Sequence, residues 1–178
     1  MVKVESNILN GLFTLAGVAV GFSLSEGASW LKSNRKNRYL KSALNSELIA
    51  IKRMIPHRQD ILSKAAHAFS DGRVLDPAST HFPRSAYESI LDNAPELLSV
   101  EEQDCLHVSY ERLRVIDEQM DTAVAYFNTV RSAHSSLHAA DALALKMSDM
   151  EEALITTIPL IDSLIQNDPI DVYNDVRT

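Results

Sequence analysis

Apolar residues recur at intervals of three or four positions through most of this 178-residue chain. That interval matches the α-helical repeat, and no stretch alternates apolar and polar residues in the manner of a half-buried strand. Three long stretches show it: one from Leu40 to Ile55, one that follows Ser99, and one that ends near Ile165. The pattern predicts an all-α fold in which these stretches bury their apolar faces against one another as a helical bundle.

Local signals predict where the helices begin and end. Pro56 is expected to end or bend the first helix, with a further short helix over about residues 57–70 and then a loop rich in Gly and Pro. Ser85 offers an N-cap for a short helix that closes at "DNAP". In "SVEEQ", Ser99 and Glu102 form a capping box, which predicts the start of the longest helix.

The same spacing predicts which residues of the last two helices face the core. On the longest helix they are Leu106, Tyr110, Leu113, Ile116, Met120, Val124, Phe127, Val130 and Leu137. On the last helix they are Leu143, Met147, Met150, Leu154, Ile158, Ile161 and Ile165.

From Ser6 to Ser25 the chain carries no formal charge over twenty consecutive residues. A helix of that length rises about 30 Å, which is the thickness of a bilayer core. Polar residues and glycines make the segment less apolar than most membrane spans, so a buried helix of a soluble protein is the alternative. The segment predicts a single N-terminal transmembrane helix, followed by a cytoplasmic helical bundle.

Basic residues predict the orientation of this span. Five lie between residues 32 and 41 with no acidic residue among them, whereas only Lys3 precedes the span. This asymmetry predicts an uncleaved membrane anchor, with the N-terminus outside and the body in the cytoplasm. The expected parts are an anchor or pore helix at 1–31, a basic juxtamembrane stalk helix at 32–56, and a cytoplasmic helical domain at 57–178. The predicted membrane-interface residues are Trp30, Lys32, Arg35, Lys36 and Arg38.

Small and polar residues gather on one face of the predicted span. Gly17 and Gly21 form a G-x-x-x-G motif that Ala28 continues, and such a face lets helix backbones approach closely in lipid. It predicts a homo-oligomer, in which the face either packs copies together or also surrounds a pore. The lining residues in the pore interpretation are Asn10, Thr14, Ser25 and Glu26. A ring of Glu26 carboxylates at the cytoplasmic mouth would favour cations.

Charge divides the chain unevenly. Residues 1–41 carry six basic and two acidic side chains, whereas residues 42–178 carry eleven basic and twenty-two acidic ones. The acidic body argues against general nucleic-acid binding, and the basic segment suits anionic lipid. A single cysteine, Cys105, excludes an internal disulfide and a cysteine-based zinc site. One acidic run is expected to form a solvated helix face: Glu101, Glu102, Asp104, Glu111, Asp117, Glu118 and Asp121.

Signals for catalysis are few. Arg131 and His138 in "RSAHSSLH" resemble the Arg-x(4–6)-His motif of HEPN ribonucleases, in which two such motifs meet across a dimer of helical bundles. Ser132 stands where that family has Asn, Asp or His. His134, His138 and Asp141 share a helix face, but no H-E-x-x-H motif or second carboxylate cluster accompanies them, so no metal site is predicted. We therefore expect no enzyme and no cofactor, with a HEPN-like ribonuclease as the enzymatic alternative.

The arrangement of the whole chain resembles a class of bacterial proteins. A single span and a basic junction precede "LKSALNSELIAIKRMI" and "FPRSAYESILDNAPELLSVEEQDCLHVSYERLRVIDEQM", which look like small membrane-anchored helical proteins encoded with defence genes. The layout is similar to oligomeric membrane effectors of anti-phage systems, such as the Hailong-type effector and the CRISPR-associated membrane protein with a degenerate HEPN body.

This resemblance implies an effector that permeabilises or depolarises the inner membrane under the control of its cytoplasmic domain. The partners it implies are membrane lipid, further copies of the chain, and a regulatory protein or nucleotide-type ligand that engages the body. The competing interpretation is a non-conducting, membrane-anchored adaptor or interaction protein.

Overall fold

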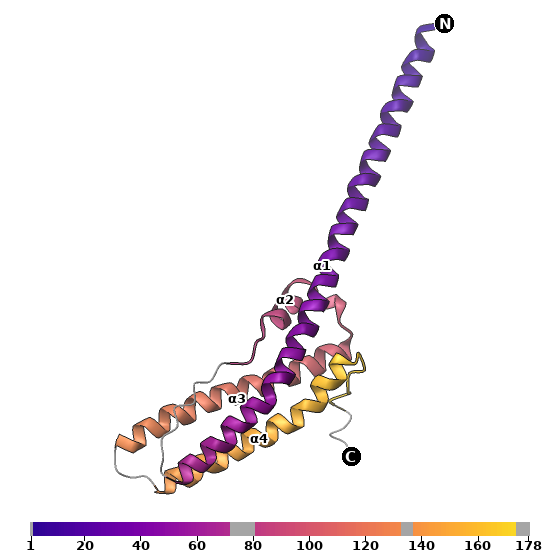
Figure 1. Cartoon of the computed structure of the whole chain (residues 1–178). Coiled ribbons are helices and arrows are strands. Elements are labelled where there is room, and N and C mark those ends of the chain that lie inside the picture. Colours follow the sequence, from indigo (N-terminus) through magenta and orange to yellow (C-terminus); the bar gives the residue numbers. More distant parts are fainter. Residues whose placement is uncertain (1, 72–80, 133–136, 174–178) are drawn as a thin grey trace. The chain divides into compact units, whose positions relative to one another are not determined.

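The computed structural model describes residues 2–71, 81–132 and 137–173, and within these ranges it describes side chains except at 2–20, 22, 23, 127, 128, 130–132 and 137–140. The elements are the α-helices α1 (Val2–Ser70), α2 (Ser85–Asn93), α3 (Val100–Ser132) and α4 (Leu137–Ile165), with a 3-10 helix η1 (Pro95–Leu97) before α3 (Figure 1). None of the described residues forms a strand. The prediction of an all-α fold is therefore confirmed.

The chain divides into two compact units, Met1–Lys41 and Ser42–Thr178, which we call unit 1 and unit 2. Unit 1 is the N-terminal part of α1. Unit 2 contains the rest of α1 together with α2, η1, α3 and α4.

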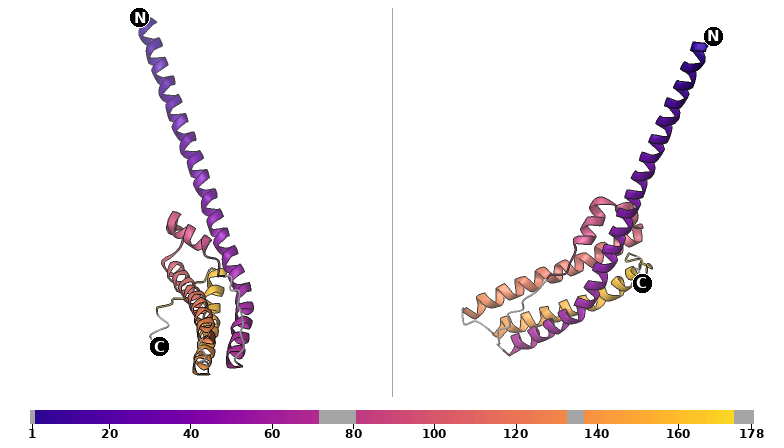
Figure 2. Two further views of the ribbon diagram at one scale, coloured as in Figure 1. Left: turned by 90° about the vertical axis from the view of Figure 1, so that its left-hand side faces the viewer. Right: turned by 45° about the horizontal axis from the view of Figure 1, so that its top comes forward.

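In unit 2, α1, α3 and α4 lie side by side in both views of Figure 2. Each contributes an apolar face to one core, and burial of each large aliphatic side chain contributes roughly 1.5–3 kcal/mol. Buried residues include Leu44, Leu48, Ile51, Ile55 and Leu62 of α1, Leu106, Leu113, Ile116 and Met120 of α3, and Leu143, Met147, Met150, Leu154 and Ile161 of α4.

Most of the predicted core positions are thus confirmed. Val124, Ile158 and Ile165 are half-buried. The side chains of Phe127, Val130 and Leu137 lie outside the described part.

Pro56 does not end the first helix of the body, so the prediction of two separate helices is wrong. Helix α1 continues through Pro56 to Ser70. The proline ring lies on the exposed side, where water can satisfy the carbonyl that loses its partner. Ile55 and Leu62 are fully buried on either side and hold both halves of the helix against the core.

Two helix ends follow their local sequence. At the start of α3, the Glu102 amide donates to Ser99 Oγ at 3.1 Å, and the Ser99 amide donates to the Glu102 carboxylate at 2.7 Å. This is the predicted capping box. At the end of α4, Asn167 adopts a left-handed conformation with φ of 57°, and the Asp168 amide donates to the Ser163 carbonyl at 2.9 Å. This is a Schellman ending, and Pro169 follows it.

In the part of the chain that the structure describes, none of the helices has the length and apolar character needed to cross a membrane. The predicted span from Ser6 to Ser25 is helical throughout as part of α1. The side chains of residues 6–20, 22 and 23 lie outside the described part.

Candidate membrane-interface site

Unit 1 exposes large apolar side chains where its side chains are described. Trp30 is 66% and Tyr39 73% exposed, and Leu24 and Leu31 are also more than half exposed. Leaving such a side chain in water forgoes roughly 1.5–3 kcal/mol relative to burial. Tryptophan and tyrosine are the residues that membrane–water interfaces favour, because one end of each ring is apolar and the other carries a polar group.

A set of basic residues follows Trp30 on the same helix. Lys32, Arg35, Lys36, Arg38 and Lys41 are all exposed, and we call this set the basic collar. No ion pair involves any of the five within the described residues. Because successive helical residues turn by about 100°, the five point to several sides of the helix. The collar therefore presents positive charge around the helix, and the predicted interface residues are exposed together with it.

The described glycine of the predicted packing face has open space around it. A Cβ atom added at Gly21 would meet nothing within 4 Å, and the same holds at Gly27. No neighbour among the described residues therefore requires glycine at position 21. Ala28, seven residues after Gly21, is exposed and lies about 20° from it around the helix. Gly17, Asn10 and Thr14 fall where side chains are not described.

The course of α1 separates Glu26 from the glycine face. Glu26 follows Gly21 by five residues of uninterrupted helix, which turns it by about 140° around the axis. A symmetric bundle packed through Gly21 would therefore not bring Glu26 carboxylates to the same axis. Lys32, eleven residues after Gly21, returns to within about 20° of it. The first charge that follows on the glycine face is thus basic.

In unit 2, a buried carboxylate joins α1 to α2 and α3. Glu47 is only 8% exposed, and it accepts hydrogen bonds from the amides of Ala86 and Tyr87 at 2.8 and 3.1 Å. It also accepts from the Tyr110 hydroxyl at 2.7 Å. These amides belong to the first turn of α2, where amides have no partner within the helix. Glu47 of α1 therefore caps the N-terminus of α2, although it lies 39 residues before Ala86 in the sequence.

This contact corrects the prediction for Ser85. Position 84 is the N-cap of α2 and forms no side-chain cap. The Ser85 hydroxyl instead donates to Glu47 at 3.3 Å.

Two stacked tyrosines cover this carboxylate. The rings of Tyr87 and Tyr110 lie 4.1 Å apart and nearly parallel, at 7°. The Tyr87 hydroxyl lies 3.3 Å from His107 Nδ1. Burial, with the hydrogen bond and charge of Glu47, raises the pKa of the Tyr110 phenol far above its ordinary range. Tyr110 therefore stays a protonated donor to Glu47 at every physiological pH.

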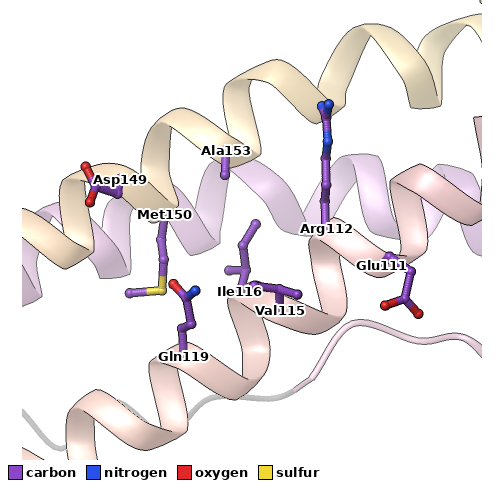
Figure 3. A pocket seen from close by; sticks show the side chains of 8 residues that line it. All are labelled: Glu111, Arg112, Val115, Ile116, Gln119, Asp149, Met150 and Ala153. Carbon is purple, nitrogen blue, oxygen red and sulfur yellow. The ribbon is translucent and has the colours of Figure 1, made fainter. Parts of the chain in front are cut away.

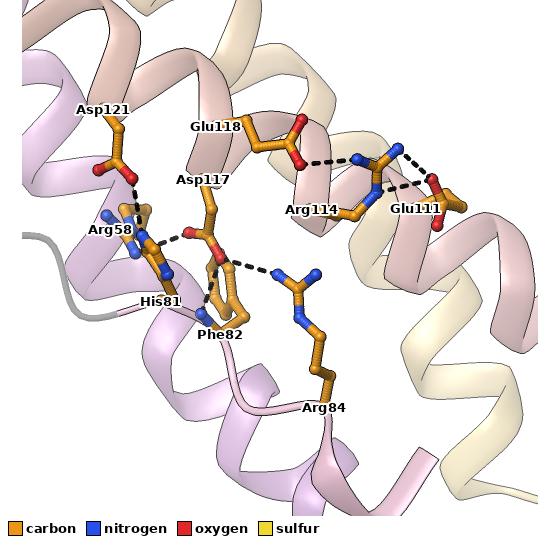
Figure 4. Close-up of polar contacts among 9 residues, drawn as sticks. All are labelled: Arg58, His81, Phe82, Arg84, Glu111, Arg114, Asp117, Glu118 and Asp121. Atoms are coloured by element: carbon orange, nitrogen blue, oxygen red, sulfur yellow. Dashed lines mark hydrogen bonds and ion pairs between the residues drawn. The ribbon is translucent and has the colours of Figure 1, made fainter. Parts of the chain in front are cut away.

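A second buried carboxylate, Asp117, lies on α3 two turns after Tyr110 (Figure 4). Asp117 is 1% exposed and pairs with Arg58 of α1 at 3.0 Å. It also accepts from the Phe82 amide at 2.9 Å and lies 3.4 Å from Arg84. The Arg58 guanidinium lies 5.2 Å from the centre of the Phe82 ring. Burial raises the pKa of the Asp117 carboxyl, and the Phe82 amide and Arg58 oppose that rise.

Asp117 thus contradicts part of the predicted solvated acidic face. The acidic run was grouped by sign of charge, but helical spacing puts Asp117 on the side of Leu113 and Met120, which are buried. The sequence signal was a charged residue at core spacing. Glu47 carried the same signal, between Leu44 and Leu48 of the apolar stripe.

Most of the candidate catalytic and metal-binding residues fall where side chains are not described. The side chains of Arg131, Ser132, His134 and His138 lie outside the described residues, and Asp141 is exposed. Within residues 2–71, 81–132 and 137–173, as far as their side chains are described, no group of three His, Cys, Asp or Glu residues is placed to hold a metal ion. Cys105 is fully buried, and burial raises the pKa of its thiol, which suits a packing role rather than a nucleophile.

No protein-family model, curated protein or solved structure matches this chain.

Proposed function

We propose that this protein is a self-associating membrane protein with one N-terminal span, which permeabilises or depolarises a bacterial inner membrane under control of its helical body. The observation that carries the membrane assignment is the exposed basic collar with Trp30. These groups follow twenty uncharged residues on the same helix, after a short segment that contains Glu26. Basic residues there suit the anionic lipid headgroups of the cytoplasmic leaflet, at about 1 kcal/mol for each charge near the surface.

The uncharged segment supports the span by its length and the collar supports its orientation. A helix from Ser6 to Ser25 matches the bilayer core, and the collar keeps the following residues on the cytoplasmic side. Unit 2 then lies in the cytoplasm. Its acidic character is compatible with this place, because the positive-inside preference depends on basic residues close to the span and little on acidic ones.

Self-association is supported by the free space around Gly21. Small residues at this spacing serve close approach of helices in lipid, where van der Waals packing drives association. In a bundle packed through this face, Asn10, Thr14 and Ser25 provide the polar groups for a water path. Lys32 on the same face, rather than Glu26, is then the first charge at the cytoplasmic end.

Control by the body is supported by the two buried carboxylate junctions. Glu47 and Arg58 lie eleven residues apart on α1, about 20° apart around the helix, and both hold the segment 81–87 and α3. A ligand or partner that displaces segment 81–87 would take the Ala86 and Tyr87 amides from Glu47 and the Phe82 amide from Asp117. The contacts of Glu47 with Tyr110 and of Arg58 with Asp117 would then be weakened but not broken. Because the predicted span belongs to the same helix, we expect this weakening to act on the membrane part.

The experiment that tests the membrane assignment is fractionation of cells that express the chain. We expect the full chain in the membrane fraction after alkaline carbonate extraction, with unit 2 protected from protease added outside spheroplasts. Changing the five collar residues to Gln should invert or mix that orientation, whereas changing the body residues Lys52, Arg53, Lys64, Arg112 and Lys146 to Gln should not. Release of the full chain by carbonate would overturn the proposal.

A second candidate is a non-conducting anchor that holds the helical body at the membrane. The displacement of Glu26 from the glycine face favours it, because the carboxylate ring was the specific feature of a cation-conducting pore. The two candidates differ in membrane potential: an anchor leaves it unchanged, whereas a conducting bundle lowers it. The proposed part in anti-phage defence rests on the resemblance of the layout, and protection of cells against phage by the full chain tests it.

A further inference from the structure

A groove of about 380 Å³ runs between α3 and α4 in unit 2 (Figure 3). Its middle is apolar: Val115 and Ile116 come from α3, and Met150 and Ala153 project toward them from α4. Val115 is 39% exposed although it lies at the centre of this surface. We call this surface the α3/α4 groove.

The two ends of the groove carry opposite charge. At one end, Arg112 of α3 donates a hydrogen bond to the Thr156 carbonyl of α4 at 3.3 Å, which places its guanidinium across the groove. At the other end lies the exposed Asp149 of α4. Glu111, which is near Arg112, is already paired with Arg114 at 2.7 Å. No ion pair engages Arg112 or Asp149 within the described residues.

This pattern is complementary to itself. A two-fold axis that runs above Val115 and Ala153, across the two helices and in the plane of the interface, exchanges the Arg112 end with the Asp149 end. Two copies facing each other across that axis would pair Arg112 with Asp149 twice. The apolar middles would meet at the axis.

Exposed apolar residues extend the surface at the Asp149 end. Tyr126 follows Gln119 by two turns of α3, and Leu145 precedes Asp149 by one turn of α4. They are 51% and 66% exposed. Apolar side chains in this number along one face of a helix pair are typical of a surface that packs against another helix pair.

We propose that the α3/α4 groove is the interface of a two-fold symmetric dimer of unit 2, formed with a second copy of the same chain. The occupant is a second copy because the groove combines an apolar middle with a basic group at one end and an acidic group at the other, which a two-fold axis brings together. The inference uses contacts of unit 2 alone and does not depend on the proposed membrane function.

Cross-linking at the axis tests the contact. In the full-length protein, purified in mild detergent, Val115→Cys should form a disulfide-linked dimer under mild oxidation, because a residue near a two-fold axis meets its own copy. The native Cys105 is buried and remains in all variants. Asp92→Cys, exposed on α2, is the control and should stay monomeric. A ladder of higher species, or equal dimer from both variants, would overturn the proposal.

Charge reversal tests the register. In the Val115→Cys chain, Arg112→Asp and Asp149→Arg should each weaken the apparent dimer affinity about tenfold, which is read as a smaller cross-linked fraction. The two changes together should restore that fraction. Asp92→Arg, an equal change of charge away from the groove, should have no effect. Single variants that dimerise as well as the parent, or a combination that does not recover, would contradict the pairing.

The span and the body can be separated in the same assay. The dimer should persist in a chain that also carries Gly17→Leu and Gly21→Leu, because the groove needs no contact in the membrane. Loss of the dimer there would show that the N-terminal helix alone brings the bodies together, and would overturn the proposal. Failure of the groove tests with intact membrane insertion would leave the proposed function standing.

Discussion

Glu47 satisfies donors from two elements at once: the amides of Ala86 and Tyr87 in α2 and the hydroxyl of Tyr110 in α3. A buried carboxylate without such donors would cost several kcal/mol in desolvation. With them it fixes where α2 starts and how α1 lies against α3. Asp117 likewise accepts hydrogen bonds from two residues of one segment, the Phe82 amide and the Arg84 guanidinium.

Replacing Glu47 by Gln should therefore destabilise the body. Glutamine keeps one acceptor oxygen but turns an amide group toward backbone donors, so the free energy of unfolding should fall by about 2–3 kcal/mol. Urea unfolding followed by circular dichroism measures this. Glu96→Gln, at an exposed position in η1, is the control and should stay within about 0.5 kcal/mol of the parent. Equal effects of the two changes would contradict the role given to Glu47.

The raised pKa of Tyr110 predicts a loss of stability at alkaline pH. Tyrosine ionises near pH 10 in the unfolded chain, whereas burial and Glu47 keep the folded Tyr110 protonated. Its contribution is thus complete below pH 10 and is lost above it, by up to about 1.4 kcal/mol per pH unit. Unfolding free energies at pH 9 and 11 should show a smaller fall for Tyr110→Phe than for the parent. For the control Tyr126→Phe, at an exposed position, the unfolding free energy should fall as much as in the parent. An equal fall in Tyr110→Phe and in the parent would contradict the role given to Tyr110.

At the scale of elements, the helices owe their ends to two kinds of contact. Helix α3 begins at a capping box made within five residues, whereas α2 begins at a carboxylate 39 residues away in sequence. The first kind is local and the second depends on the assembled body.

The capping box of α3 can be tested alone. Ser99→Ala removes the acceptor for the Glu102 amide and should lower the free energy of unfolding by about 1 kcal/mol. Ser46→Ala is the matched control, because Ser46 lies inside α1 and bonds only the carbonyl one turn back. Alanine is the better helix former there, so stability should hold or rise slightly. A Ser99→Ala protein as stable as Ser46→Ala would contradict the cap.

The glycine face makes a second prediction at this scale. Gly17→Leu with Gly21→Leu should abolish cross-linking between N-terminal helices, at a cost of a few kcal/mol for each interface. Gly27→Leu is the control: Gly27 is equally open but lies about 120° away from Gly21 around the helix. A cross-linking ladder that is the same in all three proteins would show that the glycine face does not pack.

At the scale of the whole molecule, periodicity was sufficient to predict the helices and most of the core. It failed where contacts between distant segments decide the outcome. Pro56 does not end a helix as its residue type alone predicts, because buried neighbours on both sides carry α1 through it. Asp117 was grouped with exposed acids, because its partner Arg58 lies 59 residues away in sequence.

Only the residue types of the candidate membrane-interface site could be predicted from the sequence. The basic collar and Trp30 are visible in the sequence because a membrane interface needs residue types rather than a fixed constellation. The displacement of Glu26 from the glycine face depends on the helix being continuous from Gly21 to Glu26. The spacing of the glycine motif alone does not give the angle between these two residues. The α3/α4 groove forms only where two helices pack together, so no local sequence pattern predicts it.

Membrane potential is the most direct test of the central claim, which is permeabilisation by a bundle of N-terminal helices. The full chain and the Gly17→Leu, Gly21→Leu chain would be expressed in bacteria to equal amounts in the membrane fraction, with Gly27→Leu as control. A potential-sensitive dye and propidium uptake would be read together while phage infection supplies any trigger. The account predicts rapid depolarisation with the full chain and with Gly27→Leu, and none with the double variant. An unchanged potential for the full chain during infection would contradict it and leave the non-conducting anchor.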